Sequence, residues 1–277
     1  MTGQFPPEVR RRVRGMLMLA AGLGLLASAA QAAPREIPKP SIPMTDTGYR
    51  DQAVPDSAPN ISGIWSRIPD RVTGSARVLQ EDGTLPPMQD WVRKIYDERM
   101  AAEARGAPLF DPTAGCVPSG IPRMYNTNYP LEIIQTKDFV IFMHEAQHNF
   151  RTVRMNAEHP AKLTPTYMGH SVGHWENGDL IIDTVGLVPH TQIDEGGIVH
   201  SDKMHLIERW RRLNDAQMEL VYTVDDPNAF TKPWSGVRLF AWTPDSRSLE
   251  YICEENNRNV PDANGLVHTV LADELNK

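Results

Sequence analysis

Short segments in which apolar and polar residues alternate fill the chain from residue 131 to residue 254. An alternation with a period of two is typical of β-strands that bury one face. Polar turns separate these segments, and Asn177-Gly178 is the strongest short hairpin signal among them. The predicted strands cover residues 132–136, 139–143, 150–155, 171–176, 179–185, 204–213, 218–224, 236–242 and 249–254.

No helical segments alternate with these strands, so we expect an antiparallel fold joined mostly by hairpins. Such a run closes most simply into an up-and-down β-barrel, and a β-sandwich is the alternative. Gly63-Ile64-Trp65 lies on a further strand that begins the domain. It resembles the G-x-W motif of lipocalin-like (calycin) barrels, in which the Trp packs against the barrel floor. The sequence therefore predicts a mainly β protein built on a single calycin-like barrel.

One segment, at about residues 87–105, has the pattern of a helix. Pro86-Pro87 suit the first turn of a helix, and Gly106 suits its end. Its apolar face consists of Trp91, Val92, Ile95 and Tyr96. We expect this helix to flank the barrel or to cover one end of it.

Residues 1–32 have the three parts of a secretory signal peptide. Four arginines precede an apolar stretch from Gly15 to Ala30, and Ala30-Gln31-Ala32 supplies a cleavage site. A membrane anchor is the alternative, but the apolar stretch is shorter than the roughly 20 residues that span a bilayer. We expect a periplasmic or secreted protein without stable membrane insertion after cleavage.

Two further parts follow the signal peptide. Six prolines between Pro34 and Asn60 predict an extended arm at residues 33–60, and residues 61–277 form the predicted barrel domain. Cleavage removes four Arg and one Glu, a charge of +3, so the net charge of −7 becomes −10. Such an acidic protein is not expected to bind nucleic acid or anionic membranes.

The chain has two cysteines, Cys116 and Cys253. An even number of cysteines in an oxidising compartment favours a disulfide, which here would close a loop of 253 − 116 = 137 residues. Two buried free thiols or one catalytic thiol are the alternatives. We predict the disulfide, because neither cysteine lies in a recognisable nucleophile motif.

The segment from His190 to His205 contains the densest group of ionisable residues. Its three histidines and three acids are His190, His200, His205, Asp194, Glu195 and Asp202. A histidine beside a carboxylate is suited to proton transfer near neutral pH. We predict that His200 is a general base supported by Asp202 or Asp194. Arg209 or Tyr167 is predicted to stabilise developing negative charge. Gly196-Gly197 suit a mobile loop that covers a cavity, and a solvated loop with incidental charges is the alternative.

The Asn177-Gly178 turn fixes a register for the two strands that it joins. Glu176 then faces Asp179, Val172 faces Asp183, and His170 faces Val185. Asp183 lies in an apolar strand and needs a partner, for which His170 or Tyr167 is suited. The predicted binding residues are His170, Asp183, His205, Trp210 and Trp175. We expect Glu208 to pair with an Arg from a neighbouring strand.

No metal or cofactor is predicted. His170 and His174 have the spacing of a ligand pair, but on a strand four residues span about 13 Å, too far for two bonds to one zinc ion. A site assembled from His190, Asp194 and His200 remains an alternative. The sequence also lacks G-x-S-x-G, phosphate-loop, dinucleotide-binding and paired C-x-x-C motifs. His144, His148 and His159 are interpreted as surface residues.

Several longer strings carry a family resemblance. They are residues 116–123, 165–171, 175–186, 200–202, His205, Glu208, Arg209, 251–253 and 255–258. In these strings the chain resembles a family of secreted bacterial proteins of unassigned activity. The resemblance implies an exported, barrel-like protein and no particular reaction.

Together these features predict a barrel that holds a small organic molecule beneath the loop at residues 188–203. The favoured function is a cofactor-free acid–base enzyme, such as an isomerase, lyase or hydratase. A non-catalytic lipocalin-like carrier or sensor is the first alternative. A metal-dependent hydrolase is the second.

Overall fold

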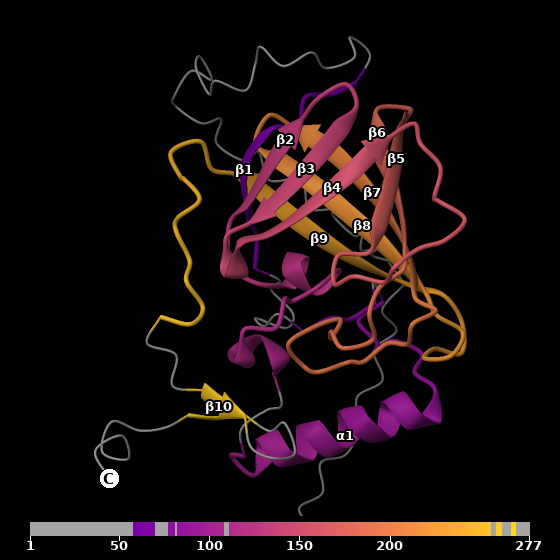
Figure 1. Ribbon diagram of the computed structural model, residues 1–277, viewed down its shortest axis with the longest axis vertical. Coiled ribbons are helices and arrows are strands. Elements are labelled where there is room, and N and C mark those ends of the chain that lie inside the picture. Colours follow the sequence, from indigo (N-terminus) through magenta and orange to yellow (C-terminus); the bar gives the residue numbers. More distant parts are fainter. Residues whose placement is uncertain are drawn as a thin grey trace, which may run out of the picture. The chain divides into compact units, whose positions relative to one another are not determined.

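Among the residues that the structure describes, nine strands form a closed barrel in chain order (Figure 1). The strands are β1 (Gly63–Arg67), β2 (Leu131–Gln135), β3 (Phe139–His144), β4 (Asn149–Met155), β5 (His170–Glu176), β6 (Asp179–Val185), β7 (His205–Asn214), β8 (Gln217–Asp225) and β9 (Trp234–Trp242). Antiparallel pairing of β1 with β9 closes the barrel. The predicted single barrel is therefore confirmed, and the sandwich alternative is not found.

This computed structural model describes residues 58–69, 77–80, 82–107, 111–255, 259–261 and 267–269. They all belong to the second of the chain's two units, Lys39–Lys277. The predicted signal peptide, residues 1–32, and nearly all of the predicted arm lie outside the described residues. No helix of the described part is long and apolar enough to cross a membrane.

The pairing of the strands is antiparallel with one exception. β4 and β5 run parallel, with Val153 opposite Ser171 and Met155 opposite Gly173. A parallel pair needs a long connection, because the chain must return to the starting edge of the first strand. Residues 156–169, which we call the crossover loop, make this return. The barrel thus departs from a purely antiparallel meander at one position.

The predicted β5–β6 hairpin is confirmed residue by residue. Val172 faces Asp183, His170 faces Val185, and Glu176 faces Asp179. Asn177 and Gly178 both have positive φ angles, of 52° and 86°. Asn and Gly tolerate this conformation, which the two-residue turn between twisted strands requires.

One predicted strand is wrong. Residues 249–254 are not a strand but pass along the outside of the barrel. The N–H of Leu249 donates to a carboxylate oxygen of Glu145, and the N–H of Tyr251 donates to the ring of His148. Backbone groups bonded in this way to side chains are not available to a sheet. Farther on, β10 (Asn259–Pro261) and β11 (Val267–Thr269) form a separate two-stranded sheet.

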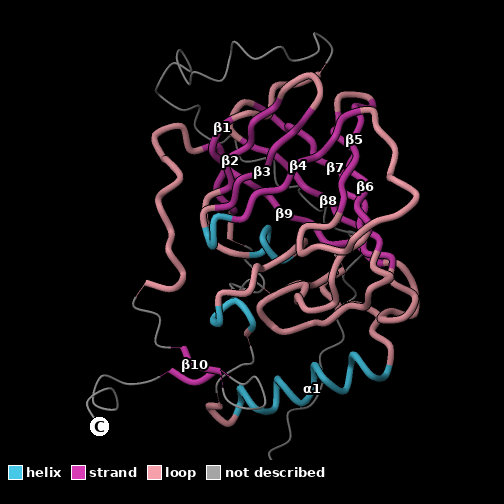
Figure 2. The backbone as a smooth tube through the Cα atoms, in the orientation of Figure 1, coloured by secondary structure: helices cyan, strands magenta, loops and turns pink. Residues whose placement is uncertain are grey.

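The predicted flanking helix is α1 (Asp90–Ala104), which begins three residues later than expected. Val92 and Tyr96 are buried on its inner face, whereas Trp91 is exposed. Three short 3₁₀ segments complete the described helical residues: η1 (Pro112–Gly115), η2 (Arg123–Asn126) and η3 (Ala146–His148). Figure 2 shows long loops and 3₁₀ segments between one end of the barrel and α1.

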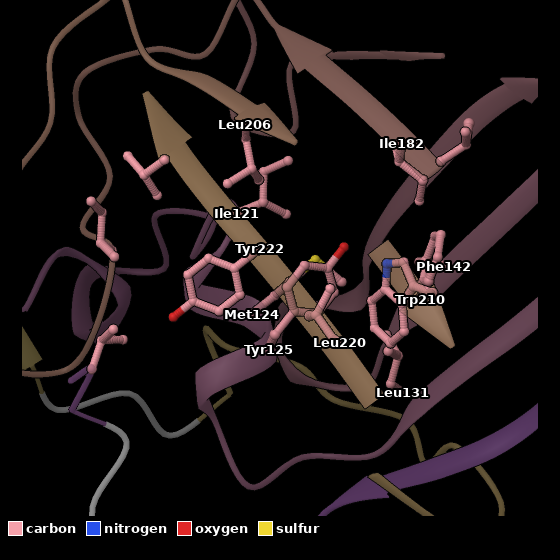
Figure 3. Packing of buried hydrophobic residues seen from close by; sticks show 14 of the residues in the cluster. Ile121, Met124, Tyr125, Leu131, Phe142, Ile182, Leu206, Trp210, Leu220 and Tyr222 are labelled. Carbon is pink, nitrogen blue, oxygen red and sulfur yellow. The ribbon is translucent and has the colours of Figure 1, made fainter. Parts of the chain in front are cut away.

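Aromatic side chains pack the barrel interior (Figure 3). The ring of Trp210 packs against those of Phe142 and Phe240, with centroids 5.1 Å and 5.4 Å away. Tyr125, from η2, meets Trp210 edge to face at 5.2 Å. Trp65 of the G-x-W motif is fully buried and donates its indole N–H to the carbonyl of Ile61. The predicted role of this Trp in the barrel floor is consistent with that burial.

The predicted disulfide between Cys116 and Cys253 is present, with Cα atoms 5.7 Å apart. It ties the residue that follows η1 to the segment outside the barrel near Tyr251. The link spans 137 residues of chain.

Candidate functional site

Residues 187–203, which we call the cap segment, fold back on themselves at one end of the barrel. Gln192 and Val199 pair across the fold, and the N–H of Ile193 donates to the carbonyl of Ile198. Ile193 and Ile198 are fully buried in the core. The predicted mobile loop is therefore a packed part of the fold.

His200 is held in the cap segment by both of its ring nitrogens. Nδ1 lies 2.9 Å from the carbonyl oxygen of Ser201, and this oxygen accepts a proton only from an Nδ1–H. In the neutral ring Nε2 is then the acceptor, and Thr191 Oγ1 donates to it at 2.7 Å. Burial lowers the pKa of His200, which favours the neutral ring. The lone pair of Nε2 is thus occupied by the hydroxyl of Thr191, and both ring nitrogens of His200 have partners within the cap segment.

The predicted pair of His200 and Asp202 is not formed. Asp202 is exposed and bonds to Lys203 at 3.0 Å. Asp194 is buried and accepts backbone N–H groups from Val78 at 2.9 Å and Ile198 at 3.1 Å. Burial raises the pKa of Asp194, while these hydrogen bonds oppose that rise. Its bonds show that Asp194 fastens the cap segment to residues 77–80.

Arg209 and the predicted aromatic residues also lie apart from His200. Arg209 is on the outer face of β7, 3.8 Å from Asp179. Trp210 belongs to the packed aromatic stack, and Trp175 is half-buried against the same core. The structure thus does not bring the predicted catalytic residues together.

A pocket of about 430 Å³ lies beside the cap segment, and we call it the cap pocket. Its lining residues are Arg99, Pro112, Val117, Tyr167, Pro189, His190, Thr191, Gln192 and Val199. They come from α1, from the residues around η1, from the crossover loop and from the cap segment. None of them belongs to a barrel strand, so the pocket lies outside the barrel interior. Tyr167 is the one predicted catalytic residue among them.

The polar lining of the cap pocket includes one cationic side chain, Arg99. Arg99 is partly buried, which lowers the pKa of its guanidinium, and it donates to the carbonyl of Gly197. Behind the lining, Arg123 donates to Gln192 Oε1 at 2.7 Å and to Asp111 at 2.6 Å. No lining residue is a carboxylate. A cationic group, an imidazole and a phenol therefore share one small site with prolines and valines.

A separate cluster of ionisable side chains lies on the outer wall of the barrel. It consists of His159, His170, Asp183 and His205. We call it the wall cluster. Asp183 Oδ1 lies 2.8 Å from Nε2 of His205 and 3.0 Å from Nε2 of His159. Nδ1 of His159 lies 2.8 Å from Nδ1 of His170. Three predicted binding residues are thus brought together, although His170 reaches Asp183 only through His159.

The hydrogen bonds assign the protons of the wall cluster. The carboxylate of Asp183 is an acceptor, so His159 and His205 each donate from Nε2–H. Neutral His159 then accepts at Nδ1, and His170 donates to it from Nδ1–H. Burial, followed by the neighbouring His159 and Arg154, lowers the pKa of His170.

The interpretation of His144 as a surface residue was wrong, whereas His159 is partly exposed on the outer wall but has side-chain partners that were not predicted. His159 is an inner member of the wall cluster, and its position before Pro160 gave no signal of this. His144 is buried, and burial lowers its pKa to about 4. The third, His148, accepts the N–H of Tyr251. A long connection between two strands was the only pattern that could have pointed to His159, because such a connection must lie against neighbouring strands.

Glu208 forms the predicted ion pair, but its partner crosses the barrel interior from β4. Nη2 of Arg151 lies 2.5 Å from Glu208 Oε2. The same guanidinium donates to Ser171, Thr184 and Tyr125. Both charged side chains are almost completely buried. Burial raises the pKa of Tyr125 well above its usual value, so the phenol stays protonated.

Within the described part of the chain, no group of three or more His, Cys, Asp or Glu side chains is arranged to hold a metal ion. The alternative metal set is not assembled, since His190 is exposed while Asp194 and His200 are bound elsewhere in the cap segment.

A second pocket, of about 330 Å³, lies on the outer wall at β3 and β4. Its apolar lining includes Ile141, Met143 and Phe150. The polar side chains His148 and Asn149 in this lining already have partners within the protein.

No protein-family model matches the chain, and no curated protein matches it either. The functional proposal therefore rests on the fold, the cap pocket and the wall cluster.

Proposed function

We propose that the protein is an exported small-molecule-binding barrel whose ligand is a small organic anion held in the cap pocket. A closed β-barrel is compatible with lipocalin-like handling of a small molecule. The disulfide, whose cysteines are 137 residues apart, is compatible with an oxidising compartment. We also propose membership of the family of secreted bacterial proteins that the motifs resemble.

The observation that carries the proposal is the combination of size and lining in the cap pocket. A volume of about 430 Å³ lies within the range of natural small-molecule sites, roughly 300–1,000 Å³. Apolar walls from Pro112, Val117 and Val199 suit the carbon skeleton of a ligand. Arg99 supplies a positive charge and Tyr167 a hydroxyl, and no lining residue is itself a carboxylate. A carboxylate on an apolar body fits this arrangement, because a guanidinium binds a carboxylate well.

The barrel interior supports the same choice by elimination. Lipocalin-like barrels have room for a ligand inside. Here Trp65, Phe142 and Trp210 fill the interior with fully buried rings, and the Arg151–Glu208 pair occupies its polar part. The site outside the strands is then the better candidate.

An acid–base enzyme remains the second candidate, and one observation favours it. His190 and Tyr167 line the cap pocket together with Arg99. His190 is exposed at the pocket, so a proton donor or acceptor lies where a ligand would bind. In this form of the proposal His190 replaces His200 as the base, and Arg99 stabilises negative charge on an enolate-like intermediate.

The binding test is isothermal titration calorimetry with a panel of small monocarboxylates, benzoate among them, and their methyl esters. We expect carboxylates to bind and the matching esters to bind at least about tenfold more weakly, the loss of one charge-assisted contact. Val117→Trp should fill the cap pocket and abolish binding. The matched control is Thr152→Trp, which fills the apolar pocket on the outer wall and should bind carboxylates normally.

Two outcomes separate the alternatives. Equal binding of acids and esters would reject the anion site in the cap pocket. Carboxylate binding that is lost in Thr152→Trp but intact in Val117→Trp would reject it as well. For catalysis, proton exchange at the α-carbon of a bound carboxylate would be followed by NMR in D₂O. If His190→Ala abolishes proton exchange without weakening ligand binding, the protein is an enzyme. If the wild-type protein shows no proton exchange, the protein is a carrier.

A further inference from the structure

The wall cluster connects three strands to the crossover loop. His170 is on β5, Asp183 on β6 and His205 on β7, while His159 belongs to the loop itself. His159 is therefore the side chain through which the loop is bonded to this part of the wall. Both ring nitrogens of His159 take part, one toward Asp183 and one toward His170.

The contact between His159 and His170 has room for one proton only. Two Nδ1 atoms 2.8 Å apart form a hydrogen bond when one carries hydrogen and the other a lone pair. A first added proton keeps this bond: it binds at Nε2 of His170, whose Nδ1 hydrogen passes to His159. Protonated His159 then donates from Nδ1–H to the free Nδ1 of His170 and from Nε2–H to the charged carboxylate of Asp183. Charge-assisted bonds of this kind are stronger than neutral ones. The first proton thus strengthens the attachment of the loop.

A second added proton destroys the contact. Both rings then carry a hydrogen at Nδ1, and these hydrogens point at each other between two positive charges. The charged groups that face the pair are Asp183 on β6, His205 on β7 and Arg154 on β4. The one carboxylate among them is already shared by two histidines. Burial and the positive neighbours His159 and Arg154 lower the pKa of His170, so this second proton binds only in acid.

The other end of the crossover loop is part of the cap pocket. The N–H of Thr166 donates to the carbonyl of Gly186 at 3.0 Å, and the N–H of Val188 donates to the carbonyl of Thr166 at 3.1 Å. The next residue, Tyr167, lines the pocket. Tyr167 therefore lies near the end of the same loop that His159 attaches to the wall.

We propose that the wall cluster is a proton-operated latch: one bound proton holds the crossover loop on the barrel wall, and a second releases it and weakens ligand binding in the cap pocket. The ligand part rests on the proposed function; the release of the loop does not. For an exported protein, the relevant change is acidification of the surrounding medium. Ligand would then be held near neutral pH and released in acid.

The test is hydrogen–deuterium exchange of the full mature protein between pH 7.5 and pH 5, corrected for intrinsic exchange rates. If opening takes up one proton, exchange in residues 156–169 should rise by up to about tenfold per pH unit in acid. Three variants give the argument its controls. His170→Gln still donates to His159 but cannot be protonated, so the loop should stay protected in acid. His170→Lys places a permanent charge and a donor at the contact, like the pair with one added proton, so a single further proton on His159 should open the loop, and it should open at a higher pH than in the wild type. His174→Gln changes an exposed histidine on the same face of β5 and should behave like the wild type.

Acid-induced exchange in His170→Gln equal to that of the wild type would overturn the latch, as would a wild-type loop whose corrected exchange does not depend on pH. Protection of β8 serves as the measure of intact folding in every variant. Benzoate binding at pH 7.5 and pH 5 then tests the coupling. If exchange in the loop depends on pH but benzoate does not bind, the latch is supported and the anion site is not. Equal benzoate affinity at both pH values, with a loop that opens, rejects the coupling alone.

Discussion

Removing the charge of Glu208 should strongly destabilise the barrel. In Glu208→Gln the side chain keeps its shape, but Arg151 loses its counter-ion. Only 1% of the Arg151 side chain and 0% of the Glu208 side chain is exposed, so water cannot replace the lost charge. Breaking such a pair by changing one partner costs about 3–5 kcal/mol. For a domain of this size we expect a fall in Tm of about 8–16 °C at 4 kcal/mol.

The assay is urea unfolding followed by tryptophan fluorescence, with a double-mutant cycle. Glu208→Leu with Arg151→Met removes both charges and should be less destabilised than the sum of the two single variants, since neither charge is left alone. Arg93→Met is the surface control, because Arg93 and Asp97 form an exposed pair on α1. Its effect should stay below about 1 kcal/mol. A Glu208→Gln protein that loses less than about 1 kcal/mol would refute the reasoning that the interior depends on this pair.

Three further predictions concern stability. Replacing Cys116 and Cys253 by Ser should lower the free energy of unfolding by about 5 kcal/mol in the chain-entropy model, measured by urea unfolding without reductant; an unchanged midpoint would contradict it. The folded pKa of His144 is about 4, below the value of about 6.5 in an unfolded chain, so its stabilising effect is present above pH 6.5 and is lost as the pH falls toward 4. The free energy of unfolding falls by about 3 kcal/mol at most over this pH range. His144→Gln should remove that fall from a plot of unfolding free energy against pH, and an unchanged plot would speak against the prediction. Gly169→Ala should cost at least about 1 kcal/mol, because φ is +63° and the new Cβ would lie 2.8 Å from the carbonyl oxygen of Val185. Gly115→Ala is the control, because its Cβ would meet open space and its φ is not in the left-handed region; equal effects in thermal unfolding would count against this account.

The barrel could be predicted because each strand and turn is determined by residues that lie close together in the sequence. Alternating side chains define each strand, and a two-residue turn such as Asn177-Gly178 fixes the register of the strands beside it. The face shared by His170 and Asp183 followed from that register alone. The segment at residues 249–254 has the same alternation, yet it is not a strand, because side chains of Glu145 and His148 bind its backbone. Such competition between distant residues leaves no mark on a local pattern.

The candidate site was less predictable, since neighbours in sequence are not neighbours in space. His200 and Asp202 are two residues apart, but the turn between them directs Asp202 to solvent and His200 to Thr191. Asp226, from a distant loop, holds that turn by accepting the N–H and the hydroxyl of Ser201, each at 2.7 Å. His159 belongs to the wall cluster because the crossover loop passes over the barrel wall there. The path of this loop depends on the parallel pairing of β4 with β5. Nothing in the hydrophobic pattern predicted this pairing.

The location of the ligand is the central claim, and NMR shift mapping tests it most directly. The protein would be labelled with ¹⁵N at histidine and tryptophan, and titrated with the tightest-binding carboxylate of the panel. We predict that the ring of His190 shifts on binding, while the indole signals of Trp65 and Trp210 inside the barrel do not. Shifts at the two indoles without a change at His190 would place the ligand in the barrel interior and contradict the account.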